Sequence, residues 1–228
     1  MCGRFTITAS AVALKETFPL FDLPDHVPRY NMAPTQMIPA IVQRGDGPKS
    51  AFLRWGLVPH WADDAKIGYR MINARAETVA SKPAFRSPFR KRRCLVLADG
   101  YYEWQKREEG KQPYWICRCD RRPFAFAGLW DHWEKGDKPI DSCTLITTSA
   151  NDFTAAIHDR MPVILDSEDH DLWLDTEAQE PERLQRLLVP CAIDLLTAFP
   201  VSTLVNNPRV DKPDCVRPLE SPGTLGNG

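Results

Sequence analysis

Cys2 is the first candidate nucleophile, because removal of the initiator Met1 would place it at the start of the chain. A small residue in second position normally permits that removal. An N-terminal cysteine has an α-amine with a pKa of about 7.7 to 8.0 and a thiol with a pKa of about 8.5, so both groups can react near neutral pH. Together they can close a thiazolidine ring on an aldehyde, or the thiol can attack an amide with the amine as its base. The position alone favours the simpler interpretation, in which Cys2 is only the residue that follows Met1.

A second candidate, Asn73, lies in the segment INARAET, two residues before the cation Arg75. Its amide could orient the start of the chain while Arg75 reaches a phosphate. The apolar spacing over residues 74–80 predicts a helix that begins at Ala74, and Asn73 would then cap it by accepting a hydrogen bond from a backbone N–H. The segment leaves both interpretations open.

Two further candidates, Glu103 and His158, could move protons. Glu103 lies in a run of large aromatic residues, and strand alternation places it on the same face as Tyr101. Burial there would raise its pKa toward neutrality and make it a general acid and base, whereas an outward Glu103 would only pair with a neighbouring cation. His158 could transfer a proton or donate to a carbonyl oxygen, although a lone histidine is commonly structural.

The charged residues are unevenly distributed along a chain of 228 residues whose net charge is −1. Residues 70–93 contain eight basic side chains and one acidic one, and residues 166–182 contain eight acidic side chains and no Lys or Arg. The basic stretch predicts either a local polyanion site or a solvated loop. Aromatic side chains in and before it favour nucleic acid, since rings stack on exposed bases: Trp55, Trp61, Tyr69, Phe85 and Phe89.

Several classes of protein are not supported by the sequence. No apolar run approaches the roughly 18 residues of a membrane helix, and the start of the chain lacks the basic and apolar blocks of a signal peptide. The seven cysteines are scattered without a CxxC pair, which predicts a reducing, cytoplasmic location rather than a disulfide scaffold. No metal-ligand spacing, Walker loop or dinucleotide fingerprint is present, so we expect no metal and no cofactor.

The pattern of apolar residues predicts an α+β fold with a curled, mainly antiparallel sheet or barrel-like core and short flanking helices. We expect a single domain over residues 1–211 and a flexible tail over residues 212–228, which are rich in Pro and Gly. The predicted strands are 38–43, 51–55, 94–104, 114–118, 124–130, 143–148 and 200–204. The predicted helices are 11–18 behind a Ser10 cap, 74–80, a segment after Asn151, 168–174 and 182–188.

Six segments, taken together, resemble the SOS response-associated peptidase (SRAP) family, in order from the first residue to about residue 208. They are MCGRF, RYNMAPTQ, RWGLVPHW, INARAET, CLVLADGYYEW and HDRMPVIL. Each segment alone is weak, but six in the correct order are specific. The resemblance implies a protein whose processed N-terminal cysteine crosslinks covalently to abasic sites in single-stranded DNA and so shields the lesion.

The resemblance also implies a role for each candidate. Cys2 would supply the amine and thiol that trap the aldehyde of the open abasic sugar. Asn73 would position Cys2, Glu103 would carry protons during sugar opening and ring closure, and His158 would stabilise the sugar oxygen and the Schiff base. The family name also implies a peptidase activity, which would use Cys2, Glu103 and His158 and could remove Met1.

The same resemblance also implies which residues contact DNA. Arg75 and Arg160 would bind the phosphates that flank the lesion, while Trp61 and Tyr69 would stack on bases at a kink or a junction of single strand and duplex. Tyr69 stands where the resemblance implies a phenylalanine, which keeps the ring. Arg4 and the cluster at residues 90–93 would add nonspecific phosphate contacts, whose contribution to affinity falls with salt.

Two other hypotheses remain open at this point. The chain could be an N-terminal-nucleophile cysteine peptidase or amidohydrolase that does not act on DNA, or a noncatalytic single-strand-binding module in which Cys2 is incidental. If the chain instead crosslinks to abasic DNA, as the resemblance implies, we expect a monomer in the cytoplasm that associates with the nucleoid when bound to DNA. We expect no membrane partner.

Overall fold

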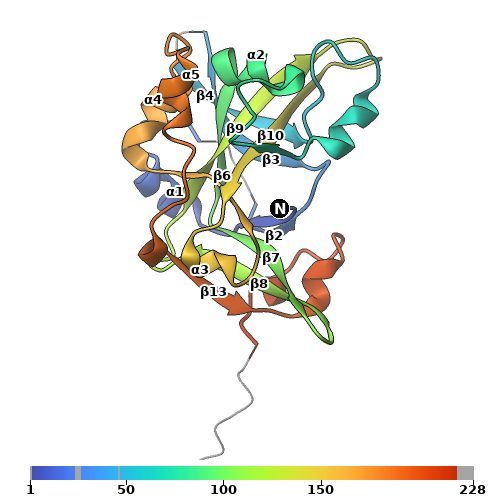
Figure 1. Cartoon of the computed structure of the whole chain (residues 1–228), viewed down its shortest axis with the longest axis vertical. Helices are drawn as coiled ribbons and strands as arrows, with labels where there is room; N and C mark the ends of the chain where they lie inside the picture. The colour runs from blue at the N-terminus through green and yellow to red at the C-terminus, as the bar shows by residue number, and fades with distance from the viewer. Residues whose placement is uncertain (1, 24–26, 46, 220–228) are drawn as a thin grey trace, which may run out of the picture.

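The protein consists of two mainly antiparallel sheets with short helices around them (Figure 1). The computed structural model describes residues 2–23, 27–45 and 47–219 of the chain. The predicted α+β class is confirmed. The first sheet has the order β13–β8–β7–β1–β2, with bounds β13 Leu196–Pro200, β8 Gly110–Arg118, β7 Gly100–Arg107, β1 Phe5–Ile7 and β2 Arg29–Met32.

The second sheet closes on itself, because β10 pairs with both β4 and β9. The chain of pairings runs β10–β4–β3–β6–β9 and returns to β10, which gives the barrel-like core that the sequence predicts. Three short strands extend this ring: β5 pairs in parallel with β10, and β11 and β12 pair with β10 and β9. The bounds are β3 Met37–Arg44, β4 Gly47–Trp55, β5 Asn73–Arg75, β6 Arg93–Ala98, β9 Phe124–Trp133, β10 Ile140–Ser149, β11 Arg160–Pro162 and β12 Ile164–Leu165.

Aromatic rings join the two sheets beneath β1. Phe5 of β1 packs edge to face on Trp55 at 5.2 Å and on Phe126 at 5.8 Å between ring centroids, and Tyr101 of β7 packs on Phe126 at 6.1 Å. All four side chains are fully buried. Burial of side chains this large contributes roughly 2 to 3 kcal/mol each, so the start of the chain is held firmly by the core.

The predicted strand at 94–104 is interrupted at Asp99, where the chain passes from β6 in the second sheet to β7 in the first. The buried Asp99 carboxylate accepts hydrogen bonds from the Thr6 hydroxyl, the Thr8 backbone N–H, the Thr8 hydroxyl at 2.7 Å and the Ala9 backbone N–H at 2.7 Å. One side chain therefore fixes the end of β1 to the junction between the sheets.

Asp99→Ala is expected to lower the free energy of unfolding by about 3 to 5 kcal/mol, because it leaves several donors without their acceptor. Urea unfolding followed by circular dichroism measures the change. Asp137→Ala, at an exposed turn residue with the same change in charge, should stay within about 0.5 kcal/mol of the wild type. Equal stability of the two variants would contradict the role of Asp99.

The basic stretch contains a helix that the sequence analysis missed, α2 (Pro83–Lys91). Its apolar face buries Phe85 and Phe89, and Trp55 is also buried, so these three rings cannot stack on bases as expected. Instead of the predicted helix over 74–80, the structure has β5 followed by turns. Asn73 is therefore the first residue of a strand and not a helix cap.

The other helices lie close to their predicted positions. They are α1 (Ala11–Thr17), α3 (Asp152–Ala155), α4 (His170–Leu174) and α5 (Pro181–Gln185). Ser10 caps α1 as predicted, because its hydroxyl accepts from the Ala13 N–H at 3.2 Å. In Figure 1, α1, α4 and α5 lie on the side of the molecule away from the mark of the N-terminus. The predicted strand at 200–204 overlaps β13 only at Pro200.

The start of the expected C-terminal tail packs on the first sheet. The turn of 3₁₀ helix η5 (Pro213–Cys215) buries Cys215 against the cluster that contains Tyr102, and the Leu219 N–H donates to the Pro200 carbonyl at 2.8 Å. Packing therefore extends to residue 219. The remainder of the expected tail, residues 220–228, lies outside the described residues. Over the described ranges, no helix has the length and apolar character needed to cross a bilayer.

Candidate functional site

The structure places Cys2 three residues before β1, fully buried, with its carbonyl oxygen bound by Asn73. The Asn73 Nδ2 donates to this oxygen at 2.8 Å, and the Tyr102 N–H of β7 donates to the Arg4 carbonyl at 3.0 Å. Burial, followed by the nearby Glu103 carboxylate, raises the pKa of the Cys2 thiol above its ordinary value. The thiol is therefore held in its protonated form at neutral pH. Met1 lies outside the described residues.

Asn73 reaches Cys2 because β5 pairs in parallel with β10, where Asn73 is opposite Leu145. This pairing turns the amide toward the start of β1, 71 residues away in the sequence. The amide oxygen, Oδ1, is buried and has no hydrogen-bond partner among the described residues. Asn73 can therefore accept one more hydrogen bond beside Cys2, which suits a role in orienting the end of the chain.

Glu103 lies on β7 with its side chain 4% exposed, on the same face as Tyr101, as strand alternation predicts. The alternative of an outward Glu103 paired with a cation is therefore wrong. Burial is the main cause that raises the pKa of Glu103 to about 7. A carboxyl group with this pKa is present in both protonation states near neutral pH, so it can both give and take a proton.

His158 lies between α3 and β11, with Nε2 4.0 Å from Oε2 of Glu103. The Arg160 N–H donates to Nδ1 at 3.0 Å, and the Asp159 carboxylate lies 2.9 Å from the same nitrogen. In the tautomer in which Nδ1 accepts from this N–H, the proton is on Nε2, the nitrogen nearer Glu103. Partial burial lowers the pKa of His158 and favours this neutral form. The ring can thus donate a hydrogen bond toward a group placed beside Glu103.

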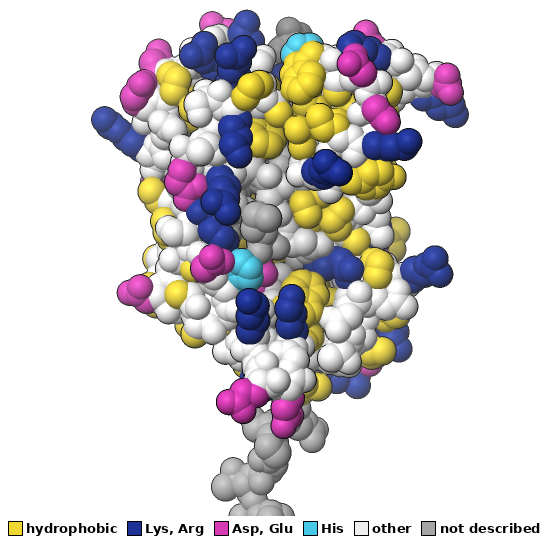
Figure 2. Space-filling model, turned by 45° about the vertical axis from the view of Figure 1, so that its right-hand side comes forward, with side chains coloured by type: hydrophobic (Ala, Val, Ile, Leu, Met, Phe, Trp, Pro, Cys, Tyr) yellow, Lys and Arg dark blue, Asp and Glu magenta, His cyan; other side chains and the backbone are white. Residues whose placement is uncertain are grey.

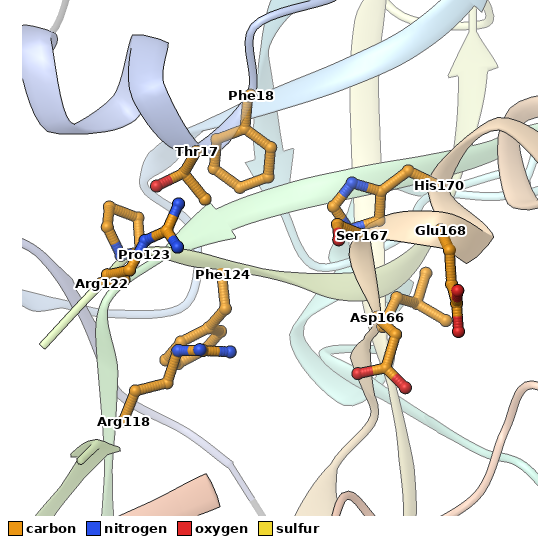
Figure 3. Close-up of a pocket in the computed structure, with 11 residues that line it drawn as sticks. Thr17, Phe18, Arg118, Arg122, Pro123, Phe124, Asp166, Ser167, Glu168 and His170 are labelled. Carbon is orange, nitrogen blue, oxygen red and sulfur yellow. The ribbon is translucent and has the colours of Figure 1, made fainter. Parts of the chain in front are cut away.

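Glu103 and His158 line a cavity of about 550 Å³ between the β7–β8 hairpin and residues 155–159. A second pocket of about 330 Å³ lies between the end of α1 and the segment that leads into α4 (Figure 3). Its walls include Arg118 and Arg122, Asp166 and Glu168, and the buried His170. It contains none of the predicted site residues, so we assign the site to the first cavity.

Trp61 and Tyr69 are exposed by 45% and 60%, and both line a cavity of about 650 Å³ beside the 3₁₀ helix η1 (Ala65–Arg70). The Arg54 guanidinium lies 5.5 Å from the centroid of the Tyr69 ring. Both rings are therefore available to stack on bases, unlike the buried rings of α2. Their contact with DNA stays a prediction.

Arg75 and Arg160, which are predicted to bind phosphates, differ in their contacts within the protein. Arg75 is exposed on β5. The Arg160 guanidinium, mostly buried, is bound on two sides by the Glu77 carboxylate, with one distance of 3.0 Å, and by the Thr147 carbonyl. Glu77, the partner of Arg160, is the one acid in the basic stretch, and the sequence alone did not indicate this pair.

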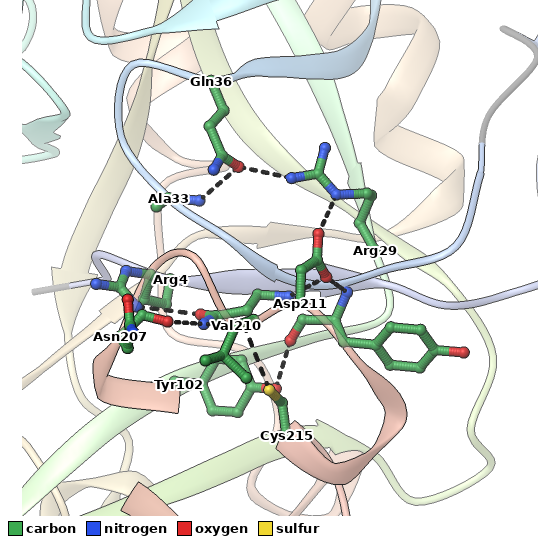
Figure 4. Close-up of polar contacts among 11 residues, drawn as sticks. Arg4, Arg29, Ala33, Gln36, Tyr102, Asn207, Val210, Asp211 and Cys215 are labelled. Atoms are coloured by element: carbon green, nitrogen blue, oxygen red, sulfur yellow. Dashed lines mark hydrogen bonds and ion pairs between the residues drawn. The ribbon is translucent and has the colours of Figure 1, made fainter. Parts of the chain in front are cut away.

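Arg4 faces the C-terminal part of the chain (Figure 4). Its Nη1 donates to the Asn31 Oδ1 at 3.1 Å and to the Val205 carbonyl at 2.7 Å. Burial lowers the pKa of Arg4. Both of these acceptors belong to the protein itself. The predicted contact of Arg4 with a phosphate stays a prediction.

Fewer cations of the cluster at residues 90–93 are exposed than expected. Arg93 is buried and donates to backbone carbonyls, including those of Phe89 at 2.8 Å and Ala178 at 3.0 Å, while Arg92 is bound to the buried Asp131. Arg93 is therefore a structural residue, and its expected phosphate contact is wrong. Arg90 and Lys91 remain exposed.

One face of the molecule combines cations with apolar side chains (Figure 2). Lys and Arg side chains flank exposed hydrophobic groups around a hollow, and acidic side chains lie mainly toward the edge of this view. Such a surface suits a polyanion that also presents rings. Among the described residues, no group of three or more His, Cys, Asp or Glu side chains is arranged to hold a metal ion.

Glu77→Gln is expected to strengthen the binding of single-stranded DNA roughly threefold to tenfold, because it releases the Arg160 guanidinium from a competing carboxylate. Fluorescence anisotropy with an undamaged oligonucleotide measures the affinity. Glu16→Gln on α1 makes the same change in net charge at an exposed position and should have little effect. The idea fails if both variants strengthen binding equally.

Comparison with known proteins gives a consistent result. A sequence model of the family described as SOS response associated peptidase (SRAP) matches residues 1–208. "Abasic site processing protein YoqW" of Bacillus subtilis is 43% identical over 221 residues, which cover 95% of this chain and 99% of the relative. "Abasic site processing protein HMCES" of Gallus gallus is 33% identical over 265 residues, with 96% and 78% coverage.

A solved structure has the same fold. The crystal structure of a protein from Bacteroides thetaiotaomicron has a TM-score of 0.82 to this chain at 27% identity, with 96% of this chain and all of that chain covered. The arrangement of two sheets around the start of the chain is therefore shared with an experimentally determined structure.

Proposed function

The chain belongs to the SOS response associated peptidase family, and from this premise we propose that it binds single-stranded DNA and crosslinks Cys2 to abasic sites. The relatives named as abasic site processing proteins support a function at such lesions. The observation that carries the proposal is the convergence of Asn73, Glu103 and His158 from three separate strands and loops around the start of the chain.

The proposed reaction joins one sugar carbon to both groups of the N-terminal cysteine. The abasic sugar opens to an aldehyde, and the α-amine of Cys2 adds to its carbonyl carbon. Loss of one water gives the Schiff base. The thiol then adds to the same carbon, the C–S bond forms, and the electron pair of the C=N bond takes up a proton at nitrogen. The net change is formation of one C–N and one C–S bond with release of one water.

The surrounding residues supply the proton transfers that this reaction needs. Glu103, with a pKa of about 7, gives a proton to the departing hydroxyl and takes one from the buried thiol. The neutral His158 donates from Nε2 to the sugar oxygen. Asn73 holds the Cys2 carbonyl, and its buried Oδ1 is available to accept from the freed α-amine.

DNA binding in this proposal uses the exposed face of the site. Arg75 and Arg160 bind the phosphates beside the lesion, and Trp61 and Tyr69 stack on bases at a kink or at a junction of single strand and duplex. The protein acts as a monomer in the cytoplasm, associated with the nucleoid while it is bound. Removal of Met1, which the reaction requires, is the peptidase step of the proposal.

Intact mass spectrometry of the protein, alone and after incubation with an oligonucleotide that has one abasic site, tests the proposal. We expect a protein mass without the first methionine, and a denatured adduct with the mass of protein plus oligonucleotide less one water. A protein that retains Met1, or a mixture without any adduct, would overturn it. An oligonucleotide without the abasic site is the control and should give no adduct.

A further inference from the structure

Two lysines, Lys106 and Lys111, lie directly opposite each other on the β7–β8 hairpin. Both are exposed, and both line the cavity that contains Glu103 and His158. Like charges at directly opposed positions of an antiparallel pair destabilise it. Two ammonium groups placed in this way favour an anion that would neutralise both.

The described acids near these lysines form no ion pair with them. Among the described residues, no carboxylate lies within ion-pair distance of Lys106 or Lys111. Asp159 lines the same cavity, but it lies against Nδ1 of His158 at 2.9 Å. Glu108 and Glu109 occupy the exposed turn of the hairpin. The two cations therefore face the cavity without an internal counter-ion.

The hairpin is held in place relative to the site. The Gln105 Nε2 donates to the Ala156 carbonyl at 2.9 Å, which ties β7 to the end of α3. The Arg107 guanidinium donates to the Tyr114 hydroxyl at 2.7 Å across the hairpin. On β7, Glu103 precedes Gln105 by two residues and Lys106 by three. The backbone positions of the two lysines are thus fixed with respect to Glu103.

We propose that Lys106 and Lys111 bind the phosphodiester backbone of single-stranded DNA as it leaves the cavity. Arg75 and Arg160 belong to strands that pair with β10 in the second sheet, whereas the lysines belong to the first. A strand bound by both groups passes the cavity between the β7–β8 hairpin and residues 155–159, which Glu103 lines. This inference rests on the proposed function and extends its DNA-binding surface.

The test compares K106Q/K111Q with the wild type in binding an undamaged single-stranded oligonucleotide over a series of salt concentrations. Each phosphate neutralised on a single strand contributes about 0.7 to the slope of log Kobs against log salt, so loss of two contacts should reduce the slope by about 1.4. K15Q/K49Q removes two exposed lysines from α1 and β4 and should leave the slope unchanged. Thermal melting checks that both variants are folded.

The outcomes separate this inference from the proposed function. A wild type that forms the abasic adduct while K106Q/K111Q keeps the wild-type slope overturns the inference alone. A wild type that binds no single-stranded DNA overturns both. If K106Q/K111Q keeps the DNA slope but loses binding to a short polyglutamate peptide, the lysines bind an acidic peptide and the DNA inference is wrong.

Discussion

Cys2→Ala is expected to eliminate the denaturant-resistant adduct with abasic DNA, a loss of roughly 100-fold or more. Alanine is also small, so removal of Met1 and the free α-amine are retained. The amine can still form a Schiff base, but no sulfur is present to close the ring, and an imine hydrolyses when the complex is denatured. Gel electrophoresis under denaturing conditions measures the adduct.

Reduction with borohydride provides the matching measurement for the same variant. It converts the Schiff base to a stable amine, so Cys2→Ala should give an adduct only when borohydride is added. Cys119→Ala removes an exposed thiol that lies 3.4 Å from the Asp194 carbonyl and should crosslink as the wild type does. An adduct from Cys2→Ala without borohydride would contradict the thiazolidine mechanism.

Glu103→Gln is expected to slow crosslinking by about 10² to 10⁴-fold, because the amide keeps the shape of the side chain but cannot transfer a proton. Affinity for undamaged single-stranded DNA should stay within about twofold, since the phosphates are bound by other residues. The wild-type rate should change with pH around the pKa of Glu103, about 7, and this change should be absent in the variant.

The exposed Glu109 in the hairpin turn provides the control for charge. Glu109→Gln should crosslink at the wild-type rate. A Glu103→Gln rate equal to that of the wild type would remove Glu103 from the mechanism, and a parallel fall in rate and affinity would assign it to the binding of DNA instead.

Glu103 should also make the stability of the protein depend on pH. Its pKa is about 7 in the folded protein and about 4.3 in an unfolded chain, so the folded state retains a proton that the unfolded state releases. The stability that this proton contributes is fully present below about pH 4 and is lost as the pH rises through 7, a loss of roughly 4 kcal/mol in the free energy of unfolding. Relative to the wild type, Glu103→Gln should therefore gain stability from pH 5 to pH 8 in urea unfolding.

The face of the strand on which Glu103 lies could be predicted from the sequence, because it depends on immediate neighbours. Alternation along one strand placed Glu103 on the face of Tyr101. The sequence left open whether this face is buried, and the structure decides for burial. The same reasoning predicted the strands that form the closed sheet, since each is long and rich in β-branched or aromatic residues.

The partners of Asn73 and Arg160 could not be predicted in this way. Whether Asn73 caps a helix or binds Cys2 depends on the pairing of β5 with β10, which no local pattern specifies. The Glu77 partner of Arg160 is 83 residues away in the sequence. Contacts over such separations follow from the topology of the sheets and not from propensity.

The helix α2 was missed for a different reason. Its dense cations were interpreted as a polyanion site or a solvated loop, and the internal Pro88 is itself unfavourable in a helix interior. The useful signal was the spacing of the buried Ala84, Phe85, Pro88 and Phe89, which repeats after four residues as one face of a helix does. Hydrophobic spacing was therefore a better guide here than charge.

The contacts of Arg4 have a consequence for how the protein is made. Two of its hydrogen-bond acceptors are the carbonyls of Val205 and Asn206, which a ribosome adds about two hundred residues after Cys2. During translation the start of the nascent polypeptide lacks these anchors. Its packing is completed only after the segment around Val205 and Asn206 has emerged from the ribosome.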